Sequence, residues 1–198
     1  MPQIDSVLDY CRGLWQLILA DERGFERLDM TALGVWRSFL AFLWCLPASA
    51  VGWASWRMYY LDGMPSGAVT GPLFFAKLLL IDLSVWLLPL LLTGLLSLLL
   101  DFSAAFGAIV ITTNWLMVPL SYAIAVPTAV ALVIPPTEPL AALLSLVVLA
   151  GSCAALFRLM RTVTGGQTLL AAAITIVFVV PPLMLVSLLR GWLGVMPG

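Results

Sequence analysis

Asp82 is the residue whose type and position most directly suggest chemistry, because it is an acid inside a long apolar segment. It follows Lys77 by five residues, so it lies about 7–8 Å deeper along a helix that rises about 1.5 Å per residue. A carboxylate at the centre of a membrane costs roughly 2.5–3.5 kcal/mol on insertion scales. We therefore expect Asp82 to face the interior of a helix bundle and to have a polar partner there.

Two roles for Asp82 follow from this position. It is either an ion-binding or proton-relaying group of a transport path, or a polar clamp between helices with Lys77 or Arg57 nearby. The apolar segments contain no second acid at a comparable depth, and a relay needs more than one such group. The clamp is therefore the favoured interpretation.

Two further polar side chains complete a candidate intramembrane site. Asn114 follows two threonines in the next apolar segment, and such groups often hydrogen-bond across membrane helices for about 0.6 kcal/mol each. Counting inward along that antiparallel neighbour places Ser121 and Tyr122 at a depth similar to that of Asp82. Asp82, Asn114 and Tyr122 are therefore the candidate site residues, and helix packing is the favoured role of Asn114.

The residue types that most enzymes and metal sites need are missing from the sequence. It contains no histidine, which removes the commonest general base and the commonest metal ligand. The three cysteines, Cys11, Cys45 and Cys153, are too scattered for a disulfide framework or a zinc site. No nucleophile elbow, phosphate-binding loop or basic stripe for nucleic acid is present. We therefore expect no enzymatic activity, no catalytic or metal-binding residue, no cofactor and no nucleic-acid partner.

Arg158 and Arg161 lie where the fourth apolar segment is expected to leave the membrane. They are three residues apart and so share one face of a helix. Such a pair can bind the anionic headgroups of lipids. The favoured interpretation is simpler, namely that the two arginines anchor the cytoplasmic end of this segment.

These side chains must be positioned by membrane-spanning helices, because the chain is 63% hydrophobic and only 10% charged. A soluble domain carries roughly 25% charged residues. Apolar runs of about 20 residues match the thickness of a membrane core. The sequence therefore predicts an all-α bundle of five transmembrane helices, at about residues 33–56, 73–100, 103–133, 139–157 and 168–190.

Glycine and proline mark the loops between these spans. They occur at residues 61–72, at 135–139, where Thr137 is the expected helix cap, and at 162–168. The third span contains Pro119 and Pro127, so it is either one kinked helix or a helix that breaks near Pro127.

An amphipathic helix is predicted at residues 3–20, and it is too short and too polar to span a membrane. Its apolar residues recur at helical spacing: Ile4, Val7, Leu8, Cys11, Leu14, Trp15, Ile18 and Leu19. The helix is expected to lie at the membrane surface, on the bundle or against a partner, with Trp15 buried and Asp9 exposed. Residues 1–30 thus form an N-terminal amphipathic segment, and residues 31–198 form the transmembrane domain.

The orientation follows from the distribution of Lys and Arg near the ends of the spans. With a cytoplasmic N-terminus, the cytoplasmic side carries Arg12, Arg23, Arg27, Arg37, Arg158 and Arg161. The outer side then carries Arg57, Lys77 and Arg190. An odd number of spans places the C-terminus outside.

The stretch at 155–175 carries a resemblance to a known family. Arg158 and Arg161 precede a Gly-Gly turn at 165–166 and the alanines at 171–173 of the last span. This order, with five spans and short loops before it, resembles bacterial members of the Yip family (Ypt-interacting, five-span membrane proteins). The acidic-tyrosine-glycine-proline motif of the eukaryotic members is absent. The resemblance implies a bacterial inner-membrane protein of the trafficking or membrane-organising type.

Taken together, these features predict a non-catalytic integral membrane protein with a scaffold, assembly or membrane-organising role. One alternative is a small transporter or channel that uses Asp82. Another is an accessory subunit of a larger membrane complex that docks through residues 3–20. Membrane lipids are the expected partners, with other membrane protein subunits as partners in the last case.

Overall fold

The computed structural model describes residues 3–65 and 69–196, and long α-helices account for most of them. The N-terminal elements are α1 (Ile4–Ile18), the 3₁₀ helix η1 (Glu22–Arg27) and α2 (Ala32–Ser38). They are followed by α3 (Ala41–Asp62), α4 (Pro72–Leu99), α5 (Ser103–Val133), the 3₁₀ helix η2 (Pro135–Thr137), α6 (Glu138–Val163) and α7 (Thr168–Trp192). The expected all-α fold is confirmed.

Five helical segments are long and apolar enough to cross a membrane, as expected from the sequence. The first runs from Ala32 to Asp62 and comprises α2 and α3, which are separated at Phe39 and Leu40. The other four spans are α4, α5, α6 and α7. The chain is therefore a polytopic membrane protein with a short amphipathic helix before its first span.

The structure differs from several of these expectations. The first span ends at Asp62, six residues beyond its expected end at residue 56. Helix α5 is continuous through Pro127, so of the two alternatives for the third span the single helix is confirmed and the break is wrong; neighbouring helices can satisfy the carbonyl groups that a proline frees. Helix α6 continues to Val163, six residues beyond the expected end. Thr137 occupies the N-cap position of α6, but its hydroxyl donates to the Ile134 carbonyl (2.7 Å) and does not cap the helix. Of the loop at 61–72, residues 66–68 lie outside the described residues.

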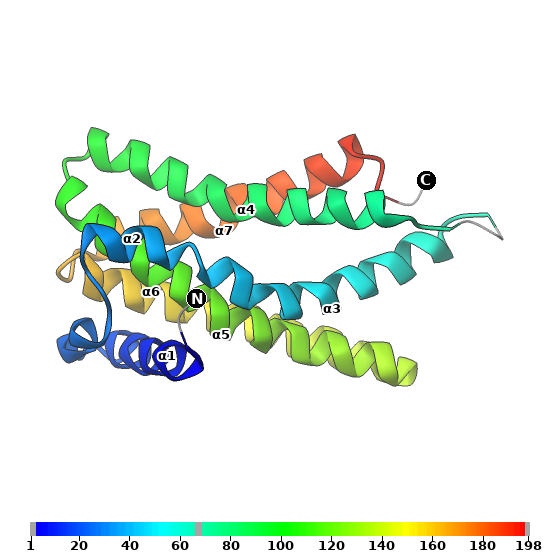
Figure 1. The fold of residues 1–198 in the computed structure, drawn as a ribbon, viewed down its shortest axis with the longest axis horizontal. Coiled ribbons are helices and arrows are strands. Elements are labelled where there is room, and N and C mark those ends of the chain that lie inside the picture. The colour runs from blue at the N-terminus through cyan, green and yellow to red at the C-terminus, as the bar shows by residue number, and fades with distance from the viewer. Residues whose placement is uncertain (1–2, 66–68, 197–198) are drawn as a thin grey trace.

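The helices pack in an order that differs from their order in the chain. Helix α5 packs against both α3 and α6, whereas α4 packs mainly against α7, which also contacts α6. The consecutive spans α3 and α4 therefore belong to different sides of the bundle, as Figure 1 shows. Helix α1 lies at the end of the bundle where α6 leads into α7 (Figure 1).

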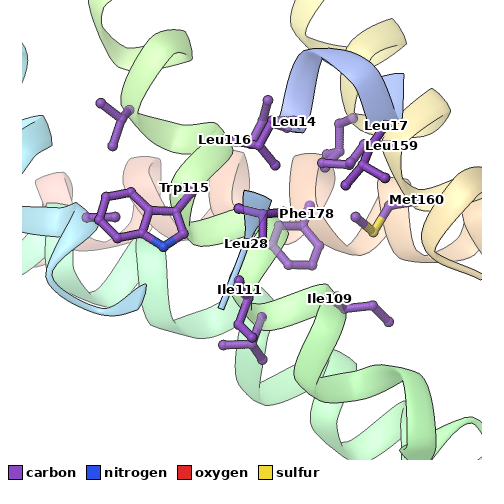
Figure 2. Packing of buried hydrophobic residues seen from close by; sticks show 14 of the residues in the cluster. Leu14, Leu17, Leu28, Ile109, Ile111, Trp115, Leu116, Leu159, Met160 and Phe178 are labelled. Carbon is purple, nitrogen blue, oxygen red and sulfur yellow. The ribbon is translucent and has the colours of Figure 1, made fainter. Parts of the chain in front are cut away.

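The main hydrophobic core surrounds the first half of α5. A continuous run from Ile109 to Leu116 is buried there, which means that neighbours cover every side of the helix at this level. Figure 2 shows how α1, α6 and α7 contribute to this core through Leu14, Leu17, Leu159, Met160 and Phe178. The amphipathic helix is therefore part of the folded bundle.

A second, smaller core lies along the N-terminal half of α4 and includes Val195, near the end of the described chain. The chain turns at Gly194, whose φ of 64° lies in the left-handed region that favours glycine. Val195 is then buried against Phe74, Leu78 and Ile81 of α4. The Trp56 indole of α3 donates to the Val195 carbonyl (2.9 Å), so this segment contacts both α3 and α4.

Candidate functional site

Asp82 of α4 faces the bundle and accepts a hydrogen bond from the indole Nε1 of Trp53 on α3 (2.8 Å). The partners expected from the sequence are engaged elsewhere. Lys77 Nζ donates to the Leu193 carbonyl (2.7 Å), and Arg57 Nε donates to Thr70 Oγ1 (2.6 Å). Long basic side chains extend toward the polar end of a span and find acceptors there. The short Asp82 side chain instead accepts a hydrogen bond from an indole of the neighbouring helix α3.

A cavity of about 360 Å³ adjoins Asp82 and is lined by side chains from all five spans. Most of its wall is apolar, with Phe42, Trp86, Met117, Leu156 and Phe178 among the large side chains. Asp82 is the one charged residue among the described residues that line it. Such a cavity can hold an apolar group and present one carboxylate to it.

A second cavity of about 260 Å³ lies on the other side of Asp82. It shares Ser49, Asp82, Ser121 and Ile124 with the larger cavity, so the two adjoin along this wall. Its remaining wall is more polar and includes the aromatic residues Trp53 and Trp56 and the cation Arg190. Asp82 therefore lines both a mostly apolar cavity and a smaller one that also contains Arg190.

Arg190 of α7 is the site residue that sequence reasoning missed. Its guanidinium carbon lies 3.6 Å from the centroid of a Trp56 ring, which is a cation–π arrangement. Its Nε is buried and has no hydrogen-bond acceptor among the described residues. Although Arg190 and Asp82 line one cavity, they form no ion pair in the described part of the chain. In the sequence, Arg190 stands at the end of the fifth expected span, and its charge enters only the assignment of the orientation.

The structure does not bring the three candidate site residues together. Asn114 is buried beside the junction of α2 and α3, where its Nδ2 donates to Ser38 Oγ (2.9 Å). Tyr122 is exposed, and its hydroxyl donates to the Trp44 carbonyl (3.1 Å). Ser121, one residue earlier, lines both cavities instead, because successive helix residues point about 100° apart.

Arg158 and Arg161 lie within α6 and before its end, and the structure gives them different surroundings. Arg158 Nε donates to the Ile18 carbonyl (2.7 Å), and Thr162 Oγ1 donates to the Leu17 carbonyl (2.9 Å). Both acceptors are carbonyls in the last turn of α1, where helical carbonyls lack partners one turn further on. The Leu17 carbonyl also accepts from the Ala20 amide (3.0 Å). Arg161 is exposed, and its contact with lipid headgroups stays a prediction. Arg158 therefore holds α1 in place as well as carrying charge.

Helix α1 presents two apolar faces, where the sequence suggested one. The bundle covers Val7 and Leu14 together with Leu17, which the sequence analysis did not include. The Tyr10 ring lies 4.7 Å from that of Trp115 on α5 and extends this contact. Trp15 is 62% exposed, so the bundle does not bury it, and its burial by lipid or by a partner stays a prediction. Ile4, Leu8 and Leu19 share this exposed face with Trp15.

The three cysteines are free and lie on different helices. Burial raises the pKa of the Cys11 thiol, which makes it a weak nucleophile at neutral pH. No group of three or more His, Cys, Asp or Glu side chains capable of holding a metal ion occurs among the described residues.

Comparison with protein-family models, with curated proteins and with solved structures found no match for this chain. The resemblance of residues 155–175 to the Yip family therefore stays a prediction.

Proposed function

We propose that this polytopic membrane protein has a non-catalytic, membrane-organising role and that α1 is the element that engages the membrane surface. The observation that carries the proposal is the exposed apolar face of α1, defined by Ile4, Leu8, Trp15 and Leu19. Burial of such side chains stabilises by roughly 1.5–3 kcal/mol each. This face therefore needs a cover that the chain itself does not provide in its described part.

Lipid is the cover that suits the surroundings of this face. The other flank of α1 carries the charges, where Arg27 of η1 pairs with Asp9 (2.5 Å) and donates to Gln16 (3.0 Å). A helix with charge on one flank and Trp and Leu on the other matches the gradient from water to acyl chains. The hydrogen bonds from α6 fix α1 at the edge of the bundle, so that its insertion would displace lipids at a defined place.

Spin labelling tests the lipid contact. Nitroxides are placed at Leu8 or Trp15 in a variant whose native cysteines are replaced by alanine, and the protein is reconstituted in lipid nanodiscs. We expect high accessibility to oxygen and low accessibility to a water-soluble nickel chelate. A label at Asp5, on the polar face, is the matched control and should show the reverse. Accessibility of Leu8 and Trp15 to nickel would contradict the proposal.

The organising role itself needs a membrane readout. Vesicles that contain the wild-type chain should differ in size distribution or shape from protein-free vesicles, as seen by electron cryomicroscopy. The double variant Leu8→Ser, Trp15→Ser should lose this effect while it keeps its helical content. Equal vesicles with both proteins would contradict the role. Protection of both labels from oxygen and nickel in native membranes would favour an accessory subunit covered by a partner.

A transport role is the second candidate, and the cavity beside Asp82 is the observation that favours it. An ionisable side chain inside a span commonly marks an ion or substrate path. Proteoliposomes loaded with a pH-sensitive dye, under an imposed membrane potential, test the proton version of this role. Proton flux above that of empty vesicles, lost in Asp82→Asn with an unchanged melting temperature, would support it. Equal flux in the two proteins would leave Asp82 as a structural clamp.

A further inference from the structure

We propose that the two adjoining cavities bind an α-amino acid with a large apolar side chain. In this arrangement the carboxylate of the ligand pairs with Arg190, its ammonium group pairs with Asp82, and its side chain occupies the larger cavity. The inference goes beyond the organising role and does not depend on α1.

The anion-binding part of the site is Arg190. A guanidinium has five N–H donors in a planar fork that matches a carboxylate. Here it stacks on Trp56, which holds the group in place but accepts no conventional hydrogen bond. Its buried Nε has no acceptor among the described residues, and an unsatisfied buried donor destabilises the unliganded site. Arg190 also lines the smaller cavity and has no ion-pair partner among the described residues, so a ligand carboxylate there can accept from its terminal N–H groups and balance its charge.

The cation-binding part of the site is Asp82. A carboxylate can accept about four hydrogen bonds, and the indole of Trp53 uses one acceptor position of Oδ2. The carboxylate also lines both cavities, so capacity remains for an ammonium group on the cavity side. The hydroxyl groups of Ser49 and Ser121 lie on the same shared wall and can orient that group.

The apolar part of the site is the larger cavity. Its volume of about 360 Å³ falls within the usual range of ligand pockets and exceeds what an aromatic or branched aliphatic side chain needs. The three parts of the site match the three groups on the α-carbon of an amino acid. Arg190 and Asp82 line the smaller cavity together, as the carboxylate and the ammonium group lie close together, and the larger cavity lies where the side chain extends. Asp82, on the wall between the cavities, is where the ammonium must sit for the side chain to enter the larger one.

The paired charges decide between this ligand and two simpler ones. An apolar amine would pair with Asp82 but would leave Arg190 unpaired and be repelled by it. An apolar acid would pair with Arg190 but would meet the carboxylate of Asp82 on the way into the larger cavity. A zwitterion satisfies both groups, because like charges in a site of low dielectric constant cost far more than in water.

A matched set of three compounds tests the proposal on the full-length protein in detergent or nanodiscs. L-Phenylalanine carries both charges, 2-phenylethylamine only the cation, and 3-phenylpropionate only the anion, on nearly the same apolar body. Isothermal titration calorimetry should show that phenylalanine binds at least tenfold more tightly than either of the others. Equal or tighter binding of the amine or the acid would overturn the proposal, as would no measurable binding of phenylalanine.

Two variants test the assigned residues. Asp82→Asn and Arg190→Gln should each weaken phenylalanine binding at least tenfold. Arg57→Gln is the matched control, because Arg57 lies on α3 near the same end but outside both cavities, and it should bind normally. Normal affinity in Arg190→Gln would overturn the assignment. If either variant fails to fold, the comparison of the three compounds on the wild-type chain still decides. The double variant Leu8→Ser, Trp15→Ser should still bind phenylalanine normally, because its changes lie on α1 and not in the cavities. Its binding therefore tests this inference independently of the proposed role of α1.

Discussion

At the scale of single residues, the Asp82–Trp53 pair shows how an acid is accommodated within the spans. The indole N–H satisfies one oxygen of the carboxylate, while the rest of the indole ring remains compatible with an apolar environment. Removing one partner of such a pair leaves the other desolvated and unsatisfied. The pair also joins α3 to α4, which otherwise pack mainly on other helices.

Trp53→Phe should therefore lower the free energy of unfolding by about 1–3 kcal/mol, because Asp82 loses its donor while most of the aromatic surface is kept. Trp36→Phe is the control, since Trp36 is 75% exposed and makes no such bond in the described structure. Thermal or denaturant unfolding in detergent measures both. A Trp53→Phe protein as stable as Trp36→Phe would contradict the clamp.

Asp29 stabilises the start of α2 in a way that depends on pH. Its Oδ1 accepts from the hydroxyl (2.5 Å) and the amide (3.2 Å) of Thr31, and Thr31 Oγ1 accepts from the Gly34 amide (3.1 Å). These bonds, with a smaller contribution from Arg37, hold the pKa of Asp29 below its ordinary value of 3.8. The stabilisation is therefore complete above that value and is lost as the pH falls through the lower pKa of the folded protein.

Asp29→Asn should remove this pH-dependent part of the stability. Relative to the wild-type chain, its melting temperature should be lower at neutral pH, and the difference should narrow as the pH falls below about 4. Asp5→Asn, a change at an exposed acid on α1, serves as the control and should leave the pH profile unchanged. A constant difference between Asp29→Asn and the wild type at every pH would contradict this account.

At the scale of elements, the contact between α1 and η1 depends on two glycines. A Cβ on Gly13 would lie 2.8 Å from the Gly24 carbonyl oxygen, and a Cβ on Gly24 would collide with the Gly13 carbonyl oxygen. The two backbones therefore touch directly. This close approach brings Arg27 within reach of Asp9.

Gly24→Ala should loosen η1 from α1 and destabilise the protein by about 1–3 kcal/mol, the usual cost of overpacking. The effect should appear as faster hydrogen exchange in α1 and η1, with little change in α4 and α7. Gly151→Ala is the matched control, because no atom lies within 4 Å of the Cβ added there, and it should be neutral or slightly stabilising. Equal exchange rates in the two variants would refute the role of this contact.

At the scale of the whole molecule, the order of the spans assigns each loop to one of two sides. With five spans, Asp62 at the end of α3 and Gln167 before α7 lie at opposite ends of the bundle. Cysteines introduced at these two exposed positions, in a variant without native cysteines, should label from opposite sides of the membrane. The excess of Lys and Arg predicts that Gln167 is cytoplasmic. Labelling of both from one side would exclude this topology.

The number and approximate ends of the spans could be predicted because each is a long apolar run, a signal that does not depend on neighbours. The hydrogen-bond partners of the polar residues could not be predicted from the sequence in this way. Counting residues along the spans predicted the depth of Asp82 and Ser121. Which residue bonds to Asp82 depends on how the helices are rotated and paired, and this places Trp53 rather than Lys77 beside Asp82 and places Arg190 in the same cavity. The two apolar faces of α1 were merged in the sequence, because periodicity shows which residues are apolar and not what covers them.

The hydrogen bonds that complete α1 have a consequence for how the protein is made. The donors Arg158 and Thr162 follow their acceptors by 140 and 145 residues. At about 5–20 residues per second, the ribosome needs roughly 7–28 s to reach Arg158 after it has made Ile18. Until α5 and α6 have been made, the face of α1 that packs on the bundle is exposed together with its other apolar face, and the bilayer surface or a chaperone must hold the nascent helix. Biogenesis should therefore be most vulnerable when the chain is stopped before α6, and protease sensitivity of nascent α1 should fall once α6 has been inserted.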